Sequence, residues 1–240
     1  MLTITKHFLL DLLFPRQCIS CKKLDTWLCD ACFRHFKPTI YQVCYLCRRP
    51  SEKAKTCKNH QIPDPKRQLD RMIVAAHYSS NPILKKAIHT LKYGRKPDDI
   101  AEKLGELLAQ TLAFHLSIFH YPRCVLIPIP LHPKRLKSRG YNQAQLLAKH
   151  IERPFSKLLT TNSELIIRPK ETTSQVSSAT RAARLENLKG AFELNGKVDS
   201  DALYILIDDV VTTGATLEEC CSILKLNGAK EVWGLVLARN

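Results

Sequence analysis

Residues 202–216 constrain the fold more than any other stretch of the chain. Residues 203–207 form a continuous run of aliphatic and aromatic side chains, which is typical of a strand buried on both faces of a parallel sheet. Asp208 and Asp209 follow, and a Thr-Thr-Gly-Ala-Thr turn leads into residues 217–224, where apolar side chains recur at helical spacing. Because ligands of open α/β sheets bind at the carboxyl ends of the strands, this order predicts a ligand site at the end of this strand.

The turn after the two acids has the composition of a phosphate-binding loop. A glycine-containing turn that opens a helix presents unpaired backbone N–H groups to an anion, and threonine hydroxyls add further donors. The two acids are expected to meet sugar hydroxyls or a metal ion held by a substrate. A plain strand, turn and helix cap is the alternative interpretation. The residues expected to form the loop are Thr212, Thr213, Gly214, Ala215 and Thr216.

The whole string resembles the motif that binds phosphoribosyl pyrophosphate (PRPP) in type I phosphoribosyltransferases. The shared order is four aliphatic positions, two acids, two aliphatic positions and Thr-Thr-Gly-Ala-Thr. The resemblance implies that residues 212–216 hold the 5-phosphate, and that Asp208 and Asp209 contact the ribose 2- and 3-hydroxyls. The loop has no Walker A lysine, which argues against an ATPase.

Seven of the ten cysteines lie between positions 18 and 57, mostly as Cys-x-x-Cys pairs. Each pair places two ligand atoms on the same side of a tight turn, and two pairs make one closed, structural zinc site. Sequential pairing joins the first pair to the second and the third to the fourth. A crossed pairing of the first with the third and the second with the fourth fits the count equally well. The expected ligands are Cys18, Cys21, Cys29, Cys32, Cys44, Cys47, Cys57 and His60.

His60 is the weakest member of this ligand set, because a histidine in Lys-Asn-His-Gln could face solvent and His35 is an alternative ligand. Without His60 the second site keeps three cysteines. A disulfide framework is a further alternative, which the lack of an export signal disfavours. A redox Cys-x-x-Cys is disfavoured because such motifs act singly in thioredoxin-like units.

The cysteine distribution divides the 240 residues in two. We expect an N-terminal helix and zinc-binding module in residues 1–62, and a phosphoribosyltransferase-like domain in residues 63–240 that begins with a proline-rich linker. Residues 7–14 are apolar but short and are interrupted by Asp11, so they predict an amphipathic helix without membrane insertion or export. A cytoplasmic protein with reduced thiols is expected.

The second part alternates between strand and helix patterns, which predicts an α/β fold with a mostly parallel, doubly wound sheet flanked by helices. The polar stretch at residues 169–188 has few core residues and predicts a mobile loop that could close over a reaction. Strands are predicted at residues 71–78, 124–130, 165–168, 191–194 and 231–238, and helices at residues 81–94, from Asp98 onward, and after Asn142.

Basic residues crowd the segment after the strand at 124–130, where a loop at the carboxyl end would neutralise a pyrophosphate. A solvated basic turn is the alternative. The residues concerned are Lys134, Arg135, Lys137 and Arg139. A second group, comprising Lys85, Lys86, Lys92, Arg95 and Lys96, is predicted to form an outward basic edge.

The net charge of the chain is +15, and it favours an anionic partner such as nucleic acid or a phosphorylated substrate. Seven cysteine thiolates with two Zn²⁺ ions would reduce this charge only to about +12. A solubilising surface charge is the alternative interpretation.

Four regions together resemble the ComF family of competence proteins: the zinc pairs, residues 128–143, residues 175–192 and the PRPP motif. The resemblance covers essentially the whole chain. It implies a double zinc ribbon joined to a type I phosphoribosyltransferase fold, acting on the cytoplasmic side of DNA uptake in natural transformation, with single-stranded DNA and an uptake ATPase as partners. His60 stands where a cysteine is often found. The matching signature residues are Arg139, Gly140, Asn142 and Gln143, with Arg184 and Asn187 in a flexible loop that also contains Arg181.

Two functions from different classes follow from these patterns. The first is a phosphoribosyltransferase that binds PRPP with Mg²⁺, in which Asp208 and Asp209 stabilise developing positive charge on the ribose and the basic segment near Arg139 stabilises the departing pyrophosphate. The second is a nucleic-acid-binding scaffold that keeps the fold without turnover. A phosphoribosyltransferase of nucleotide salvage is a third alternative, which the zinc pairs disfavour.

Overall fold

The computed structural model describes residues 15–36, 38–39, 41–57, 68–78, 81–117, 121–169 and 190–239. The expected helix at residues 7–14 lies outside the described residues, as does the expected loop except for Pro169. The predicted site residues His60, Arg181, Arg184 and Asn187 also lie outside them and stay predictions.

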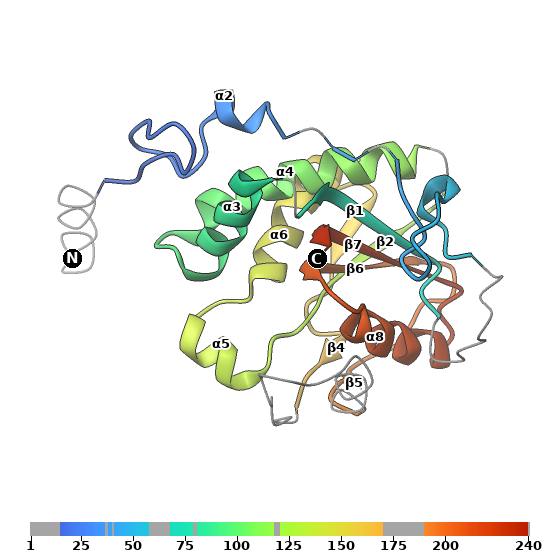
Figure 1. Ribbon diagram of the computed structural model, residues 1–240. Coiled ribbons are helices and arrows are strands. Elements are labelled where there is room, and N and C mark those ends of the chain that lie inside the picture. The colour runs from blue at the N-terminus through green and yellow to red at the C-terminus, as the bar shows by residue number, and fades with distance from the viewer. Residues whose placement is uncertain are drawn as a thin grey trace.

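A five-stranded sheet forms the centre of the described chain, in the order β1-β7-β6-β2-β3 (Figure 1). Every neighbouring pair is parallel, which confirms the α/β prediction. β6 carries the acidic motif and is the middle strand, so neighbours cover both of its edges. The strands are β1 (Arg71–His77), β2 (Cys124–Pro128), β3 (Leu159–Thr161), β6 (Leu203–Val211) and β7 (Glu231–Arg239).

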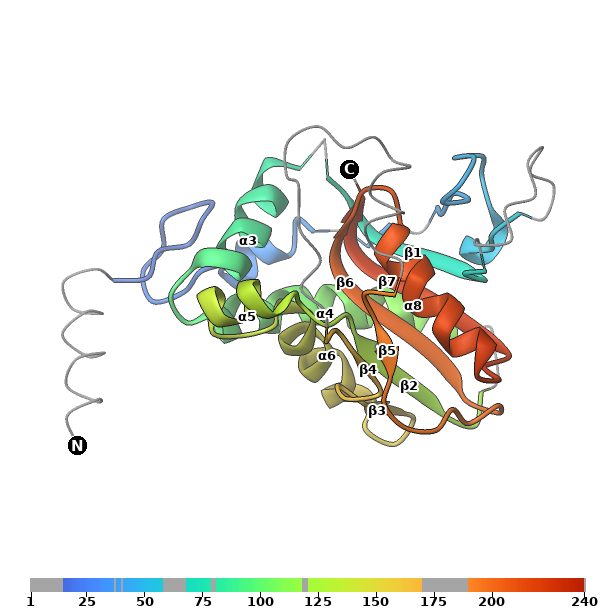
Figure 2. The same ribbon diagram turned by 90° about the horizontal axis from the view of Figure 1, so that it is seen from below.

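Helices cover both faces of this sheet. Figure 1 shows α4 above the strands, α3 to their left and α8 below them, and Figure 2 shows α6 beside α4. Side chains of β6 alternate between the two layers: Leu203, Ile205 and Ile207 pack with the first group of helices, whereas Tyr204 and Leu206 pack on the side of α8. The helices are α3 (Pro82–Tyr93), α4 (Pro97–Leu116), α5 (Pro133–Arg139), α6 (Gln143–Glu152), the 3-10 turn η2 (Arg153–Phe155) and α8 (Ala215–Leu226).

Local signals in the sequence set the ends of α3 and α4. The Asn81 side chain accepts a hydrogen bond from the backbone N–H of Leu84 (2.9 Å), and Gly94 follows the last turn of α3, as predicted. α4 begins at Pro97, one residue before the predicted start, because a proline is favoured in the first turn of a helix. Asp98 and Asp99 then lie in the first turn, where their charges complement the helix dipole.

The basic segment after β2 is a helix, so the prediction of a loop there was wrong. Pro133 occupies the first turn of α5, and the His132 side chain accepts a hydrogen bond from the N–H of Lys134 (3.2 Å). Gly140 ends the helix with a φ of +80°, a conformation that favours glycine.

Two short strands pair with each other outside the main sheet. β4 (Ile166–Ile167) and β5 (Glu193–Leu194) are antiparallel, so the expectation that residues 191–194 join the doubly wound sheet was wrong. The backbone N–H of Asn195 donates to the carbonyl of Leu165 (2.8 Å), which closes the pair. Phe192 is buried in the hydrophobic cluster on the side of α8, so the pair packs over that face of the sheet.

The cysteine-rich segment wraps the free edge of β1. Its regular elements are α2 (Asp30–Phe33) and the 3-10 turn η1 (Glu52–Ala54). On one side, the indole N–H of Trp27 donates to the carbonyl of Arg95 beside α4 (3.0 Å). At the edge, the Gln42 side chain accepts from the N–H of Val74 and donates to the same residue's carbonyl, both at 3.1 Å. These contacts supply β1 with partners that an edge strand otherwise lacks.

No helix in the described part of the chain combines the length and the apolar character needed to cross a membrane. The predicted cytoplasmic location stays a prediction.

Candidate functional site

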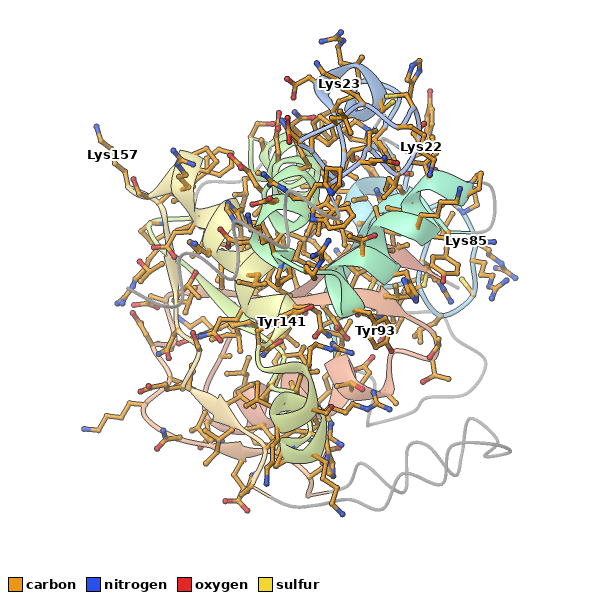
Figure 3. The ribbon with its side chains drawn as sticks, turned by 90° about the vertical axis from the view of Figure 1, so that its left-hand side faces the viewer. Lys22, Lys23, Lys85, Tyr93, Tyr141 and Lys157 are labelled. Atoms are coloured by element: carbon orange, nitrogen blue, oxygen red, sulfur yellow. The ribbon has the colours of Figure 1, made fainter. Side chains whose placement is uncertain are left out.

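A cavity of about 720 Å³ opens beside the carboxyl-terminal half of β6. Residues of α3, α5, β4's carboxyl end and β6 contribute its charged wall, and Tyr93 and Tyr141 lie near one another on the same side of the molecule (Figure 3). The charged lining residues are Lys92, Arg135, Arg139, Arg168, Asp208 and Asp209. Four cations around two carboxylates suit a ligand that carries several negative charges and also offers hydroxyl groups or a metal ion.

The two acids lie inside β6 and not after its end, which corrects the predicted strand boundary. Asp208 pairs with Val236 of β7, and the strand continues to Val211. Alternation along the strand turns the two side chains toward different faces of the sheet, and both reach the cavity at the end of the sheet. The Asp209 carboxylate is buried and lies 2.5 Å from the ammonium group of Lys92, whereas Asp208 is partly exposed at the cavity.

The environment of Asp208 favours its neutral form. Burial of the carboxyl is the main cause that raises its pKa, and the negative charge of Asp209 raises it further. The N–H of Asp209 donates to the Asp208 carboxylate (2.8 Å) and acts in the opposite direction without cancelling the shift. A ligand that requires the carboxylate must therefore displace a proton from Asp208.

The predicted phosphate loop is the entry to α8. Gly214 immediately precedes the helix with a φ of +80°, and the Thr213 hydroxyl accepts a hydrogen bond from the N–H of Ala215 (3.3 Å). Thr212 is exposed and Thr216 lines the cavity, so the loop is accessible where the helix dipole favours an anion. The order of strand, turn and helix is as predicted, but Ala215 and Thr216 of the predicted loop already belong to α8.

Two of the four predicted basic residues of α5 face the cavity. Arg135 and Arg139 line it, whereas Lys134 and Lys137 are exposed and are not among its lining residues. The Arg139 guanidinium donates to the side-chain oxygen of Gln143 and lies over the ring of Tyr93, 5.4 Å from its centroid. Gln143 therefore holds Arg139 in place.

Asn142 has a structural role in the same signature. Its side-chain oxygen accepts from the N–H of Ala144 (3.0 Å) and begins α6, and its side-chain amide donates to the carbonyl of Ile129 (3.0 Å). This residue ties the start of α6 to the end of β2.

Lys92 and Arg168 belong to the cavity although the sequence did not single them out as site residues. Lys92 was predicted on an outward basic edge, but it ends α3 with its ammonium group against Asp209. Arg168 follows β4 and lies over the ring of Phe192, 5.0 Å from its centroid. Burial lowers the pKa of Arg168, and the nearby charge of Arg135 lowers it further. The available signal for both residues was their position: Lys92 lies in the last turn of a predicted helix, and Arg168 is at the end of a predicted strand.

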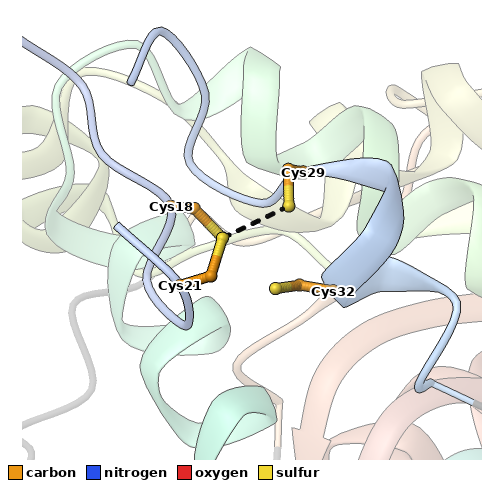
Figure 4. Close-up of side chains that lie close together, drawn as sticks. All are labelled: Cys18, Cys21, Cys29 and Cys32. Carbon is orange, nitrogen blue, oxygen red and sulfur yellow. Dashed lines mark hydrogen bonds between the residues drawn. The ribbon is translucent and has the colours of Figure 1, made fainter. Parts of the chain in front are cut away.

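Seven cysteines form two separate clusters, and within each cluster the sulfur atoms all lie within 4.8 Å of one another. Figure 4 shows the first of them. A tetrahedral zinc ion with Zn–S bonds of about 2.3 Å requires sulfur atoms about 3.8 Å apart. The measured 3.6 Å between Cys21 and Cys29 and 3.3 Å between Cys47 and Cys57 are close to this value, so the sites fit zinc. The first cluster is Cys18, Cys21, Cys29 and Cys32, and the second contains Cys44, Cys47 and Cys57.

This grouping is the sequential pairing, so the crossed alternative was wrong for the described cysteines. The ten cysteines, all of which are described, are free thiols. Burial raises the pKa of Cys18, but backbone N–H groups of Cys29, Cys21 and Ser20 donate to its sulfur and lower the pKa overall, to about 6. Such a thiol is readily deprotonated, as a zinc ligand must be.

Similar proteins extend over nearly the full chain. The DNA utilization protein YhgH of Escherichia coli O157:H7 is 32% identical over 236 residues, covering 92% of this chain and 96% of that protein. Competence protein F of Haemophilus influenzae is 30% identical over 236 residues, with coverage of 94% and 98%. Competence protein ComFC of Bacillus subtilis is 27% identical over 223 residues, with coverage of 91% and 86%.

Two further similarities concern parts of the chain. A solved structure of a hypoxanthine phosphoribosyltransferase from Staphylococcus aureus aligns with a TM-score of 0.34 and 14% identity; the alignment covers 58% of this chain and 65% of that one, slightly less than two thirds of its length. Residues 9–61 match the family described as Double zinc ribbon domain. With relatives of this identity and coverage, the chain belongs to the ComF/YhgH family, and here a double zinc ribbon is joined to a five-stranded parallel sheet.

Proposed function

We propose that this protein binds PRPP with Mg²⁺ in the cavity beside β6 and acts in DNA uptake during natural transformation. The observation that carries the proposal is that the acids of β6, Thr216 of the loop and the arginines of α5 line one cavity. PRPP has a 5-phosphate, adjacent ribose hydroxyls and a pyrophosphate, and each of these groups meets side chains or backbone donors of the matching chemistry there.

Each part of the cavity has a proposed task. Backbone N–H groups at the start of α8 bind the 5-phosphate, and Asp208 accepts hydrogen bonds from the ribose hydroxyls. Arg135 and Arg139 neutralise the pyrophosphate from the opposite wall. The carboxylate of Asp208 or of Asp209 fits Mg²⁺ as a hard oxygen ligand, and the ion would add positive charge beside the leaving pyrophosphate.

The same residues would support phosphoribosyl transfer. As the bond to pyrophosphate breaks, positive charge develops on the ribose, and a carboxylate at Asp208 stabilises it without a covalent bond. An acceptor nitrogen then forms the new bond at the anomeric carbon. Arg139 remains with the pyrophosphate because Gln143 and Tyr93 hold its guanidinium.

A single-stranded DNA partner is supported by a different observation. Exposed lysines and the two tyrosines of the cavity lie on the same side of the molecule (Figure 3), and Tyr93 is 69% exposed. Exposed aromatic rings among cations bind single strands by stacking on bases and attracting phosphates. The net charge of +15 and relatives named for DNA utilization and competence support this role. The proposal places it in the cytoplasm, beside an uptake ATPase. The labelled lysines on this side are Lys22, Lys23, Lys85 and Lys157.

The same face favours a second candidate function, a DNA-binding scaffold without turnover. The two candidates differ in whether incubation with PRPP and an acceptor releases pyrophosphate. Both candidates use the same PRPP site if the scaffold binds PRPP as an effector.

Calorimetry of PRPP with Mg²⁺ tests the proposal. Wild type is expected to bind, whereas Asp208→Asn/Asp209→Asn is expected to lose binding. Asp201→Asn, which changes an exposed acid paired with Lys230 away from the cavity, is the control and should bind as wild type does. Repeating the titration with single-stranded DNA measures whether the two ligands are linked. Wild type that binds no PRPP with or without DNA would contradict the proposal.

A further inference from the structure

The second cysteine cluster and the phosphate loop meet at one contact, between Tyr45 and Gly214. Tyr45 lies in the tight turn between the ligands Cys44 and Cys47. Its ring faces the side of Gly214 where a side chain would be, since a Cβ added to this glycine would lie 3.6 Å from Cε2 and 3.7 Å from Cδ2 of Tyr45, in ordinary van der Waals contact. A residue of the zinc module therefore lies beside the residue that immediately precedes α8.

The position of the Tyr45 ring is fixed by packing. Tyr45 is only 4% exposed and belongs to the same hydrophobic cluster as Leu69, Met72 and Leu217. Its hydroxyl is buried and has no hydrogen-bond partner among the residues that the structure describes, so the ring and not the hydroxyl supplies the contact. The sulfur atoms of the second cluster fix the backbone turn that carries this ring.

The first cluster is placed differently. It contacts the helices on the other face of the sheet, where Asp30 pairs with Lys103 of α4 at 2.6 Å and Trp27 bonds the carbonyl of Arg95. The hydrophobic cluster around it contains α3, α4 and α6 residues and no residue of the phosphate loop. The two zinc sites of one chain therefore differ in whether they touch the loop.

We propose that Tyr45 is a positioning residue for the phosphate loop, and that zinc at the second cluster and a phosphomonoester at residues 212–216 bind cooperatively through it. The inference rests on the proposed function, because it takes the loop as the 5-phosphate site. Zinc restrains the turn, the turn restrains the ring, and the ring supports Gly214 in its left-handed conformation. Pyrophosphate, which binds at Arg135 and Arg139, does not depend on this contact.

Calorimetry with two separate probes, ribose 5-phosphate and inorganic pyrophosphate, tests the role of the ring. Tyr45→Ala is expected to weaken ribose 5-phosphate binding about tenfold, a typical coupling, and to change pyrophosphate binding less than about twofold. Tyr45→Phe keeps the ring and should restore wild-type binding. Tyr41→Ala removes a ring that is 90% exposed and is the control. Equal ribose 5-phosphate affinity in Tyr45→Ala and wild type would overturn the inference while leaving the proposed function intact.

A second measurement uses wild-type protein and does not depend on a variant that folds. Linkage is reciprocal, so ribose 5-phosphate should slow the release of one zinc equivalent to a chelating dye about fivefold and leave the other unchanged. The slowed zinc must be the one that remains in Cys18→Ser, where the first cluster is disrupted. Release of both zinc ions at unchanged rates, under conditions where ribose 5-phosphate binds, contradicts the coupling. If wild type binds no ribose 5-phosphate at all, the 5-phosphate site of the proposed function fails, and the coupling fails with it.

Discussion

The ammonium group of Lys92 lies 2.5 Å from a carboxylate oxygen of Asp209, and this ion pair joins the last turn of α3 to β6 beside the cavity. Only 6% of the Asp209 side chain is exposed, against 25% for Lys92. A buried carboxylate needs a counterion. Lys92 supplies it in the free protein, at a carboxylate that could also bind the Mg²⁺ of the proposed ligand. Ligand binding at Asp209 is therefore expected to compete with Lys92.

Removing Lys92 should destabilise the protein. Lys92→Met leaves Asp209 buried without its counterion and is expected to lower the free energy of unfolding by about 1–3 kcal/mol, measured by urea denaturation. Lys92→Met/Asp209→Asn should recover most of this loss. Lys86→Met changes an exposed lysine of the same helix and is the control. Equal unfolding midpoints for Lys92→Met and Lys86→Met would contradict the role of the ion pair.

PRPP affinity should rise with pH through the neutral range. Burial and the charge of Asp209 raise the pKa of Asp208 well above its ordinary value, so the free site keeps a proton at a pH where an ordinary carboxyl has lost it. Binding of ribose hydroxyls or Mg²⁺ favours the carboxylate and releases this proton, so affinity increases until the pH exceeds the raised pKa. Calorimetry of PRPP–Mg²⁺ in buffers of different ionisation enthalpy measures the protons released. An affinity that is flat across this range, with no proton release, would show that Asp208 is ionised in the free protein.

Glu218 should make the fold less stable as pH rises. Its carboxylate accepts hydrogen bonds from the N–H groups of Gln68 (2.8 Å) and Leu69 (3.2 Å), but burial is the larger effect and raises its pKa to about 7. The folded state therefore holds this proton more tightly than the unfolded state does. The contribution of Glu218 to stability is greatest below the unfolded pKa of about 4.5 and is lost as pH rises through about 7.

Glu218→Gln removes this titration and keeps an oxygen that can accept the two hydrogen bonds. The variant is expected to be about 1–3 kcal/mol more stable than wild type at pH 8, with a flatter dependence on pH in urea denaturation. Glu219→Gln, at the partly exposed neighbouring position, is the matched control. A Glu218→Gln curve that keeps the wild-type slope would assign the pH dependence to other groups.

Substituting one cysteine of either cluster should lower the zinc content by one ion per chain. The protein is expected to hold two zinc ions per chain, and Cys21→Ser or Cys47→Ser should each remove one, because each cluster loses one of its sulfur ligands. Cys124→Ala changes a buried thiol on β2 outside both clusters and should keep both ions. Metal analysis of purified protein measures these ratios, and a variant with both ions still bound would exclude its cysteine as a ligand.

Patterns within short segments of the sequence predicted the parts of the fold that are determined by residues close together in the chain. The aliphatic run of β6 and the Asn81 cap of α3 each carry their own signal, and both are found where the sequence places them. The basic segment at 133–139 was misread as a loop because its charges outweighed the helix signals of Pro133 and Gly140. The three-residue β3 was missed because only pairing with β2 defines it.

The sequence predicted the contiguous motif of the candidate site, but it did not predict the residues that approach this motif from other elements. Asp208, Asp209 and the loop are contiguous, so their proximity follows from the chain itself. Lys92 reaches Asp209 from a distant helix, and Tyr45 reaches Gly214 from the zinc module, so neither contact leaves a local signal. Such contacts depend on how distant elements pack against each other. The spacing of residues along a single sequence does not reveal this packing.

The strand order has a consequence for how the chain can fold during synthesis. β7 lies between β1 and β6, so residues 231–239 occupy an interior slot of the sheet although they follow both neighbours in the sequence. Until the ribosome has released this strand, β1 and β6 each present an unpaired edge to the cytosol. Closure of this slot is a long-range pairing and is therefore slow. The nascent chain is thus most vulnerable to aggregation at these two strands, and a chaperone that shields them would have its greatest effect before β7 inserts.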